Sequence, residues 1–313
     1  MKLVADIGGT KTLLAVADGG VLSHQARYEN VEFDSADALL ARYLETLPAA
    51  TRGGLRRASL AVAGPVQTDS ARVTNRPHWH LQKAALATLL GVSEVVLRND
   101  FVATALGLAG LAPAELVTLQ AGQTESSSPQ LCLGPGTGLG VAAVANGQVI
   151  ASEGGHIAFA PTDSEQVELW RFLGGEHRRL IAERVCSGPG LLACYRFCLI
   201  RAGHALPPDL DPAEVVRRAD STYDPDARHA LALFARLFGA FAGDLALTFL
   251  ARGGVYLTGG VAPKILNHLQ TGTFVEAFNS KAEHSDLVRR IPVHVVLAED
   301  LALRGAAVDV RSA

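Results

Sequence analysis

The sequence predicts an α/β protein with a mixed sheet, and three observations carry this prediction. Strand-like and helix-like hydrophobic patterns alternate through the first hundred residues and again after Gly110. The length of 313 residues is long for one hydrophobic core, so we expect two domains. Three glycine-rich turns each follow an apolar run, at Asp6–Thr10, Gly134–Gly140 and Gly259–Gly260. Such turns let a backbone come close to a ligand and present its amide groups.

The first hundred residues indicate the order of the first sheet. We expect three strands joined by tight turns at Leu3–Ile7, Thr12–Ala17 and Val21–Tyr28. Three hairpin-like strands followed by strand–helix alternation favour a mixed sheet. The elements expected next are a helix at Ser35–Leu47, a strand at Ser59–Ala63, a helix at Leu81–Leu90, a strand at Val92–Leu97 and a helix at Phe101–Leu108.

A second alternation begins near Gly110. Four strands are expected at Glu115–Leu119, Gln130–Leu133, Val141–Ala145 and Gln148–Ala151, and the pattern becomes helical from Ser164. The longest helix, Asp226–Arg252, repeats apolar residues every three or four positions, which is typical of a core helix. Strands at Val255–Leu257 and Pro292–Leu297 precede a closing helix at Asp300–Val310, with Asp300 expected as its N-cap.

Composition excludes several classes of function. The formal net charge is −3 and no basic stripe stands out, so nucleic acid is not an expected partner. The chain opens on a strand-like run, without the pattern of a secretion signal. Arg236 and Asp244 interrupt the apolar stretch Leu231–Leu250, so we expect no membrane span. The four cysteines form no Cys-x-x-Cys pair and are interpreted as buried apolar packers in a reducing compartment.

The first glycine-rich loop indicates a phosphate site. The amide groups of Gly8, Gly9 and Thr10 follow a strand end, where α/β proteins place ligands. Asp6 is a candidate ligand for Mg²⁺, directly or through water. A tight β-hairpin turn is the alternative interpretation of the same residues. With Lys11 following, the loop matches neither a Walker A motif nor a dinucleotide-binding motif.

Asn99 and Asp100 lie at the next strand–helix junction. Asp100 occupies the expected N-cap position of the following helix, so a purely structural role is one interpretation. The functional interpretation is a carboxylate at a strand end that accepts a hydroxyl proton. The amide of Asn99 offers both a donor and an acceptor, which suits a polyol.

Two further segments carry candidate polar ligands. Glu153 and His156 flank two glycines in one short turn, and Glu183 precedes the segment Ser187–Gly190. The alternatives are a glycine-rich turn with an incidental histidine, and helix punctuation with Ser187 as N-cap. No further residues at metal-ligand spacing accompany them. Taken together, the loops and carboxylates suit phosphoryl transfer from ATP to a hydroxyl, which needs phosphate positioning, a metal and a base.

An ordered set of motifs resembles the bacterial ATP-dependent glucokinase family nearly from end to end. The segments that carry the resemblance are Asp6-Ile-Gly-Gly-Thr10, Ala61-Val-Ala-Gly-Pro65, Val73-Thr-Asn75 with Trp79, Asn99-Asp100-Phe101, Gly134–Gly140, Glu153-Gly-Gly-His156, Glu183-Arg-Val with Ser187–Gly190, and Gly259-Gly260. The resemblance implies a two-domain actin-like ATPase (RNase H-like) fold with the active site in the interdomain cleft. It implies a small domain of residues 1–109 plus 298–313 and a large domain of residues 110–297.

The resemblance also implies the roles of the site residues. Asp100 would be the catalytic base for the 6-hydroxyl of D-glucose, giving glucose 6-phosphate and ADP. Asp6 would lie near Mg²⁺, and the enzyme would be a cytoplasmic homodimer. Glucose would bind Asn99, Asp100, Glu153, His156 and Glu183. ATP would bind Asp6, Gly8, Gly9, Thr10, Lys11, Gly136, Thr137, Gly138, Gly259 and Gly260.

Some residues depart from the pattern of the family. Pro135 stands where a small residue is expected and removes an amide donor from the second loop. Lys11 stands where related enzymes often have asparagine. The ROK sugar kinases and repressors share the first loop, but their cysteine-rich zinc loop has no counterpart after His156. Two alternative functions stay open: a kinase for mannose, fructose or an amino sugar, and a non-catalytic sugar or nucleotide sensor.

Overall fold

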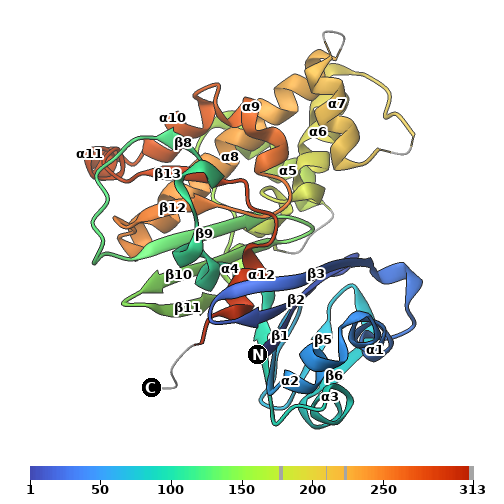
Figure 1. Cartoon of the computed structure of the whole chain (residues 1–313). Helices are drawn as coiled ribbons and strands as arrows, with labels where there is room; N and C mark the ends of the chain where they lie inside the picture. Colours follow the sequence, from blue (N-terminus) through green and yellow to red (C-terminus); the bar gives the residue numbers. More distant parts are fainter. Residues whose placement is uncertain (176–178, 209, 222–223, 310–313) are drawn as a thin grey trace. The chain divides into compact units, whose positions relative to one another are not determined.

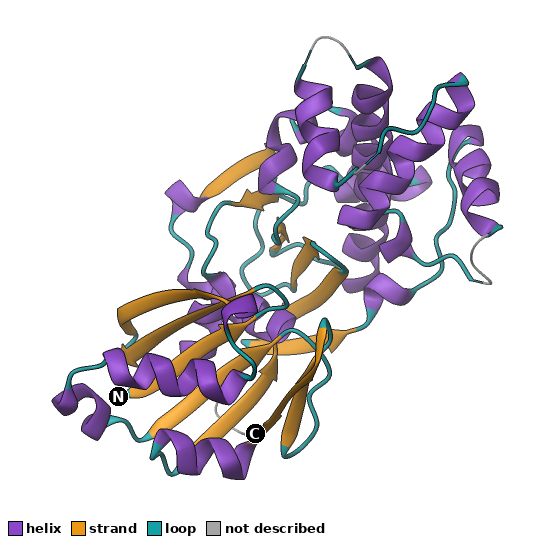
Figure 2. Ribbon diagram, turned by 90° about the vertical axis from the view of Figure 1, so that its right-hand side faces the viewer, coloured by secondary structure: helices purple, strands orange, loops and turns teal. Residues whose placement is uncertain are grey.

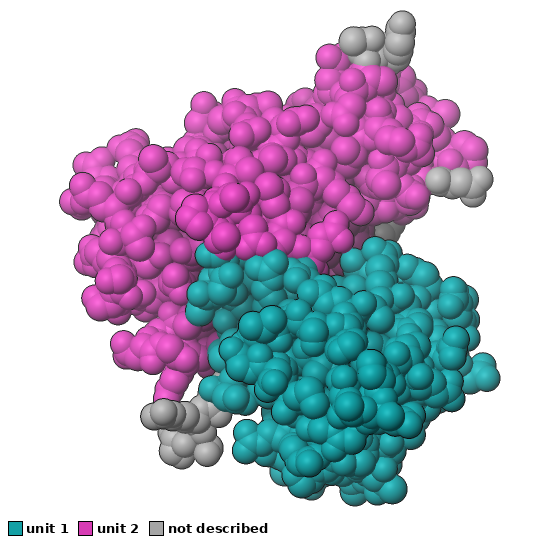
Figure 3. Space-filling model, viewed as in Figure 1, with its two compact units in different colours: residues 1–111, 300–313 teal, residues 112–299 magenta. Residues whose placement is uncertain are grey.

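The computed structural model describes residues 1–175, 179–208, 210–221 and 224–309, and they form two compact units (Figure 3). Unit 1 consists of residues 1–111 and the described residues from Asp300 onward, and unit 2 of residues 112–299. The expected boundaries, at 109/110 and 297/298, precede both junctions by two residues. Their interpretation as the limits of folding domains stays a prediction.

Unit 1 is built on a five-stranded sheet in the order β3-β2-β1-β4-β7, of which β1, β2 and β3 are labelled in Figure 1. The neighbours β1, β2 and β3 are antiparallel, whereas β1, β4 and β7 run parallel, so this is the mixed sheet that the sequence predicts. The carboxyl ends of β1, β4 and β7 therefore lie at one edge of the sheet. The strands are β1 (Lys2–Ile7), β2 (Lys11–Asp18), β3 (Val21–Glu29), β4 (Arg57–Val62) and β7 (Glu94–Asn99).

Helices cover both faces of this sheet. Along β1, Leu3 and Ile7 belong to the core beneath α1 (Ala36–Thr46) and α3 (Lys83–Leu90). Val4 points to the other face and packs with residues of α4 (Asp100–Gly107) and α12 (Leu301–Ala307). The short helix α2 (Ala49–Gly54) leads into β4.

A two-stranded hairpin of β5 (Ser70–Val73) and β6 (Arg76–Gln82) completes unit 1. The sequence analysis did not predict this hairpin and began the following helix at Leu81. In the structure, Trp79 and Leu81 are buried alternate residues of β6, and the helix begins at Lys83.

The closing helix has Asp300 as its N-cap residue, at the expected position. Asp300 precedes α12, but its side chain makes no capping hydrogen bond. Its Oδ1 lies 2.9 Å from Nε of Arg304, one turn further along. Gly305 of α12 packs on the backbone of Ala103 in α4, where a side chain would not fit.

Unit 2 is built on a six-stranded sheet in the order β11-β10-β9-β12-β13-β8. Helices gather beside this sheet around the long central α8 (Figure 1, Figure 2). The strands are β8 (Leu116–Gln120), β9 (Gln130–Pro135), β10 (Leu139–Ala145), β11 (Gln148–Ser152), β12 (Gly254–Leu257) and β13 (Val293–Val296). The helices are α5 (Ser164–Gly174), α6 (Gly188–Ala202), α7 (Pro212–Asp220), α8 (Pro225–Phe249), α9 (Leu266–Leu269), α10 (Thr273–Asn279) and α11 (Ser285–Val288).

The long apolar helix α8 lies in the core of unit 2. Among the described residues, it is the one helix whose length and composition would allow it to cross a membrane. Most of its residues are buried, including Phe234, Phe238 and Phe241. The helix therefore has the burial of a core helix in a globular protein, as its sequence predicts.

Candidate active site

The first glycine-rich loop connects β1 to β2 in unit 1. The N–H of Gly8 donates to the carbonyl of Lys11 at 3.0 Å, which closes a tight turn. A Cβ atom at Gly8 would lie 2.9 Å from that carbonyl oxygen, and one at Gly9 would lie 3.0 Å from Nδ2 of Asn75. A side chain at Gly8 would therefore collide with the backbone, and one at Gly9 would have to displace the side chain of Asn75.

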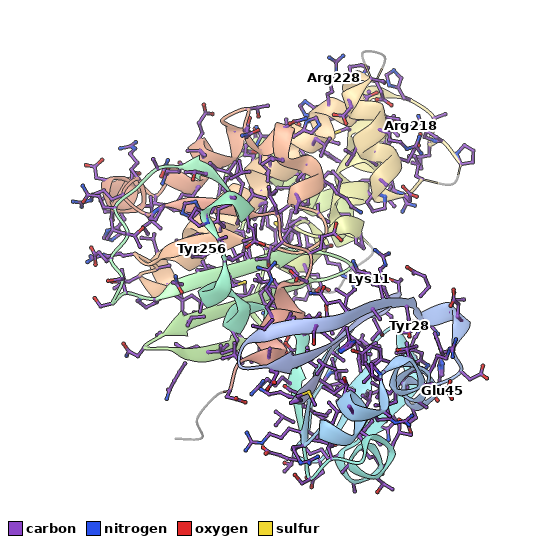
Figure 4. All side chains as sticks on the ribbon, viewed as in Figure 1. Lys11, Tyr28, Glu45, Arg218, Arg228 and Tyr256 are labelled. Atoms are coloured by element: carbon purple, nitrogen blue, oxygen red, sulfur yellow. The ribbon has the colours of Figure 1, made fainter. Side chains whose placement is uncertain are left out.

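Two carboxylates meet near this loop. Asp6 lies one residue before the end of β1, and Asp100 follows the end of β7. Burial and the charge of Asp100 together raise the pKa of Asp6 to about 7, against the charge of Lys11, which lowers it. Burial also raises the pKa of Asp100 to about 6, against a hydrogen bond from the N–H of Phe101. The structure therefore brings Asp6, Lys11 and Asp100 together, as their assignment to one site requires. Lys11 is the first residue of β2 and pairs with Glu29 of β3; Figure 4 labels Lys11 and also Tyr28, the residue before Glu29.

The junction between β7 and α4 corrects the predicted cap. Asn99, rather than Asp100, is the N-cap, because its backbone is extended at φ −61° and ψ 142°. Oδ1 of Asn99 accepts from the N–H of Phe101 at 2.9 Å and of Val102 at 3.3 Å, and Nδ2 donates to the carbonyl of Gly64 at 3.3 Å. Asp100 is the first helical residue, and the cap fixes it at the strand end.

The second glycine-rich loop is the hairpin between β9 and β10 in unit 2. The N–H of Gly136 donates to the carbonyl of Gly138 at 2.8 Å, and Thr137 between them is exposed. Pro135 is buried and pairs with Leu139 as the last residue of β9. The missing N–H of Pro135 is therefore at a strand position, and the residues of the turn itself, Gly136 to Gly138, each have a backbone N–H.

Glu183 lies directly against this hairpin. Its Oε2 accepts from the N–H of Leu139 at 2.9 Å, and a Cβ atom at Gly138 would lie 2.7 Å from the same oxygen. Ser187 donates to the carbonyl of Glu183 at 2.6 Å and caps α6 by accepting from the N–H of Gly190. The predicted N-cap at Ser187 is confirmed, and the cap and Glu183 form one hydrogen-bonded turn.

Glu153 and His156 lie on the exposed side of a turn that follows β11. Nδ1 of His156 is 3.7 Å from Oε2 of Glu153, with both side chains mainly exposed. Gly154 and Gly155 between them are buried against β10, where a Cβ at Gly155 would collide with the carbonyl of Leu139. Leu139 thus joins three segments, and unit 2 brings the second loop, Glu183 and this turn together.

The third glycine pair follows β12 and also reaches the second loop. Gly259 has a positive φ of 77°, and a Cβ there would lie 2.8 Å from the carbonyl oxygen of Pro135. That carbonyl accepts from the N–H of Val261 at 3.0 Å. Gly259 and Gly260 are therefore placed beside the hairpin, as one nucleotide-binding surface of unit 2 requires.

The described ranges contain no group of three or more His, Cys, Asp or Glu side chains that is placed to hold a metal ion. Asp6 of β1 and Asp100 of α4 are two carboxylates that lie near the first loop. Magnesium ions are often held by one or two carboxylates together with substrate phosphates, so this donor set suits a metal that arrives with a nucleotide.

Two side chains that contact the first loop, those of Asn30 and Arg76, are not predicted from the sequence. Asn30 donates to the carbonyl of Gly8 at 2.9 Å, and Arg76 donates to the carbonyl of Gly9 at 3.1 Å. They lie 22 and 67 residues from their partners along the chain, so no local pattern indicates the contact. The segment Val73–Trp79, quoted above for the resemblance, is the one signal that pointed near Arg76.

Known proteins share both the sequence and the fold. The sequence model of the glucokinase family matches residues 3–313. A glucokinase of Neisseria gonorrhoeae is 34% identical over 311 residues, which cover 98% of this chain and 93% of that protein. The crystal structure of a glucokinase from an Antarctic psychrotroph has a TM-score of 0.85 at 32% identity, covering 98% of this chain and 97% of that one.

A more distant structure shows the same fold. The glucokinase of Balamuthia mandrillaris, solved in complex with glucose, has a TM-score of 0.78 at 23% identity, covering 98% of this chain and 92% of that chain. The mixed α/β architecture is that of actin-like ATPase sugar kinases, as the sequence analysis expects.

Proposed function

Since this chain belongs to the glucokinase family, whose members are ATP-dependent hexose kinases, we propose that Asp100 is its general base toward glucose. The reaction transfers the terminal phosphoryl group of ATP to a sugar hydroxyl. The observation that carries the proposal is the placement of Asp100: a carboxylate at the strand edge, beside the first glycine-rich loop, with a pKa that burial raises to about 6.

Asp100 accepts the proton of the 6-hydroxyl while the sugar oxygen forms its bond to the γ-phosphorus. The bond between that phosphorus and the bridging oxygen breaks, and ADP leaves with the electron pair. A base whose pKa lies just below neutrality is mostly ionised at pH 7, yet it is basic enough to take the proton. The proton thus ends on Asp100 and is later lost to solvent.

We assign the remaining polar residues to glucose. Asn99 keeps one N–H beyond its bond to Gly64 for a sugar hydroxyl. Glu153 and His156 present exposed polar groups on one turn, and Glu183 has a second carboxylate oxygen besides the one bound to Leu139. A sugar site of this kind rejects analogues that leave its polar groups unpaired.

The glycine-rich loops suit the nucleotide. We assign phosphate binding to Gly8, Gly9, Thr10 and Lys11 in unit 1 and to Gly136, Thr137 and Gly138 in unit 2, because both are partly exposed glycine-rich turns. Gly259 and Gly260 would lie against adenosine, since the positive φ of Gly259 lets the backbone pass close to the second loop.

Asp6 suits Mg²⁺. Its carboxylate lies near a second carboxylate, Asp100, and burial makes its charge costly without a cation. A bound Mg²⁺ would neutralise charge on the phosphates and orient the transferred group.

We also propose a cytoplasmic homodimer, by analogy with the family. Light scattering of the purified protein would test the dimer.

The test is a coupled assay of ADP release over a panel of hexoses, with Asp100→Asn beside the wild type. We expect glucose to give the highest kcat/KM, and Asp100→Asn to lower kcat about 10²- to 10⁴-fold while glucose binding persists. Because the base must be ionised, kcat/KM should fall as the pH drops below about 6.

Asp286→Asn is the matched control, because Asp286 is exposed and pairs with Arg289, three residues along its own segment. A higher kcat/KM for mannose, fructose or an amino sugar would instead identify a different hexose kinase. Binding of glucose and ATP without any sugar phosphate would identify a sensor, and near-normal turnover of Asp100→Asn would remove Asp100 from the role.

A further inference from the structure

The first glycine-rich loop is held by its carbonyl groups. Nδ2 of Asn30 donates to the carbonyl of Gly8 at 2.9 Å, and the backbone N–H of Asn30 donates to the carbonyl of Thr10 at 2.7 Å. Nε of Arg76 donates to the carbonyl of Gly9 between them at 3.1 Å. Three consecutive carbonyl groups of the loop are therefore bound by two residues from other parts of unit 1.

The opposite groups of the loop are left for a ligand. In the part of the chain that the structure describes, the N–H groups of Gly9 and Thr10 donate to no protein acceptor. A peptide plane whose carbonyl is bound on one side directs its N–H to the other side, because the two groups are antiparallel. The contacts of Asn30 and Arg76 thus fix the direction in which these N–H groups point.

The burial of Asn30 is the reverse of what hydropathy predicts. Asn30 is fully buried, whereas the neighbouring Val31 is 80% exposed. Oδ1 of Asn30 accepts from the hydroxyl of Thr12 at 2.8 Å, and Thr12 is also fully buried. Burying two polar side chains in place of a valine costs free energy unless all their groups are bonded. Asn30 and Thr12 are bonded in this way, and Asn30 also binds the carbonyl groups of Gly8 and Thr10 in the glycine-rich loop.

Arg76 reaches the loop from the β5–β6 hairpin. Its guanidinium lies over the ring of Trp79, 5.1 Å from the ring centroid. Trp79 is buried, and its Nε1 donates to the carbonyl of Asp34 at 3.2 Å. The hairpin is thereby anchored, and the arginine is held in the orientation that meets Gly9.

We infer that Asn30 and Arg76 are positioning residues for nucleotide phosphates: they hold the carbonyl groups of the Gly8–Thr10 loop so that its N–H groups face the phosphate oxygens. Neither residue touches the reacting atoms in this assignment. The inference rests on the proposed function, since it assumes that this loop binds the phosphates of ATP.

The decisive comparison is Arg76→Met against Arg76→Lys. Methionine keeps a long side chain over Trp79 but cannot donate to the carbonyl of Gly9, whereas lysine can. We expect Arg76→Met to raise KM for ATP and Kd for the ATP analogue AMPPNP about three- to tenfold, the loss of one hydrogen bond. KM for glucose should stay within about twofold of the wild type, and Arg76→Lys should recover most of the change in KM for ATP.

The matched control is Arg56→Met. Arg56 also belongs to unit 1 and donates to two carbonyl groups, those of Gly53 and Leu55, each at 2.8 Å. It therefore loses the same charge and the same type of hydrogen bond away from the loop, and its KM for ATP should not change. Asn30→Asp gives a second measurement on Nδ2, and its melting curve shows whether the variant folds.

The inference is overturned if Arg76→Met and Arg56→Met give the same KM for ATP, or if Arg76→Met raises KM for glucose as much as KM for ATP. It is also overturned if lysine restores nothing. A failure of the proposed function looks different, because the wild type itself would then release no ADP with any sugar. The Kd for AMPPNP still reports on the loop in that case.

Discussion

Asp6 shows at the scale of one residue how a site can oppose the stability of its own fold. Burial and the charge of Asp100 raise the pKa of Asp6 from 3.8 to about 7. The folded state thus binds a proton that the unfolded chain releases near pH 4, so ionisation of Asp6 destabilises the folded protein as the pH rises through 7.

We therefore predict that Asp6→Asn is more stable than the wild type at pH 8, although it should have lost most activity. The expected gain is about 1–2 kcal/mol, since partial exposure of the side chain reduces the full linkage effect. The gain should shrink as the pH falls from 7 towards 4. Thermal melting at several pH values, without nucleotide or Mg²⁺, measures it, and a pH-independent difference would contradict the prediction.

Single residues also show what sequence can and cannot predict about the site. Asp6, Asn99, Asp100 and Glu183 stand in short motifs, and the structure places them at strand ends or loops that can meet a ligand. Their roles stay proposals. Asn30 carries no such signal, because its neighbour Val31 is the residue that hydropathy would bury.

At the scale of elements, α8 and α10 are in contact through glycine. A Cβ atom at Gly239 of α8 would lie 3.0 Å from the carbonyl carbon of Phe274 and closer still to its oxygen. Phe274 itself packs edge-on against Phe238 at 5.5 Å between centroids. The backbones of the two helices are therefore in direct contact at Gly239, and this contact is possible only because Gly239 has no Cβ atom.

We predict that Gly239→Ala destabilises the protein by about 1–2 kcal/mol, even though alanine is the better helix former by about 1 kcal/mol. The backbone of α10 cannot move aside as a flexible side chain could. Gly174→Ala in α5 is the control, because among the described residues no atom outside its own turn of helix lies within 4 Å of the added Cβ. Denaturant unfolding should show a lower midpoint for the first variant and an equal or higher midpoint for the second.

The elements that sequence predicts well are those with long periodic patterns. The helix at α8 and the three N-terminal strands agree with their expected ranges within a few residues. The β5–β6 hairpin escaped because its strands are short and Pro77 interrupts the second, so its alternation merged with the helix that follows. The strand order of either sheet depends on pairings between distant segments, which no local pattern specifies.

At the scale of the whole molecule, the two units differ in how the chain builds them. Unit 2 is one continuous segment, whereas unit 1 needs α12 from the far end of the sequence. Leu301 and Leu303 of α12 are buried. Lys2 donates to the carbonyl of Ala307 at 2.9 Å, and Arg98 donates to that of Ala306 at 3.4 Å. Without α12, the face of the sheet that carries Val4 keeps only α4 and loses the contacts of Ala302, Leu303 and Ala306.

We predict that the fragment of residues 112–299 unfolds cooperatively on heating, whereas residues 1–111 alone do not. Joining residues 300–313 to residues 1–111 through a flexible glycine–serine linker should restore a cooperative transition, because α12 again covers Val4 and Ala103. Circular dichroism melting of the three fragments measures this. An equally sharp transition for residues 1–111 without α12 would contradict it.

The return of α12 to the first sheet has a consequence for synthesis on the ribosome. Asp6 and Asp100 are translated before unit 2, but α12, the helix that completes their unit, is translated after it. If residues 1–111 do not fold without α12, as predicted above, the nascent amino-terminal segment stays incompletely folded while unit 2 is made. A premature stop codon before Leu301, which removes α12, would therefore be expected to disable the acidic pair of Asp6 and Asp100.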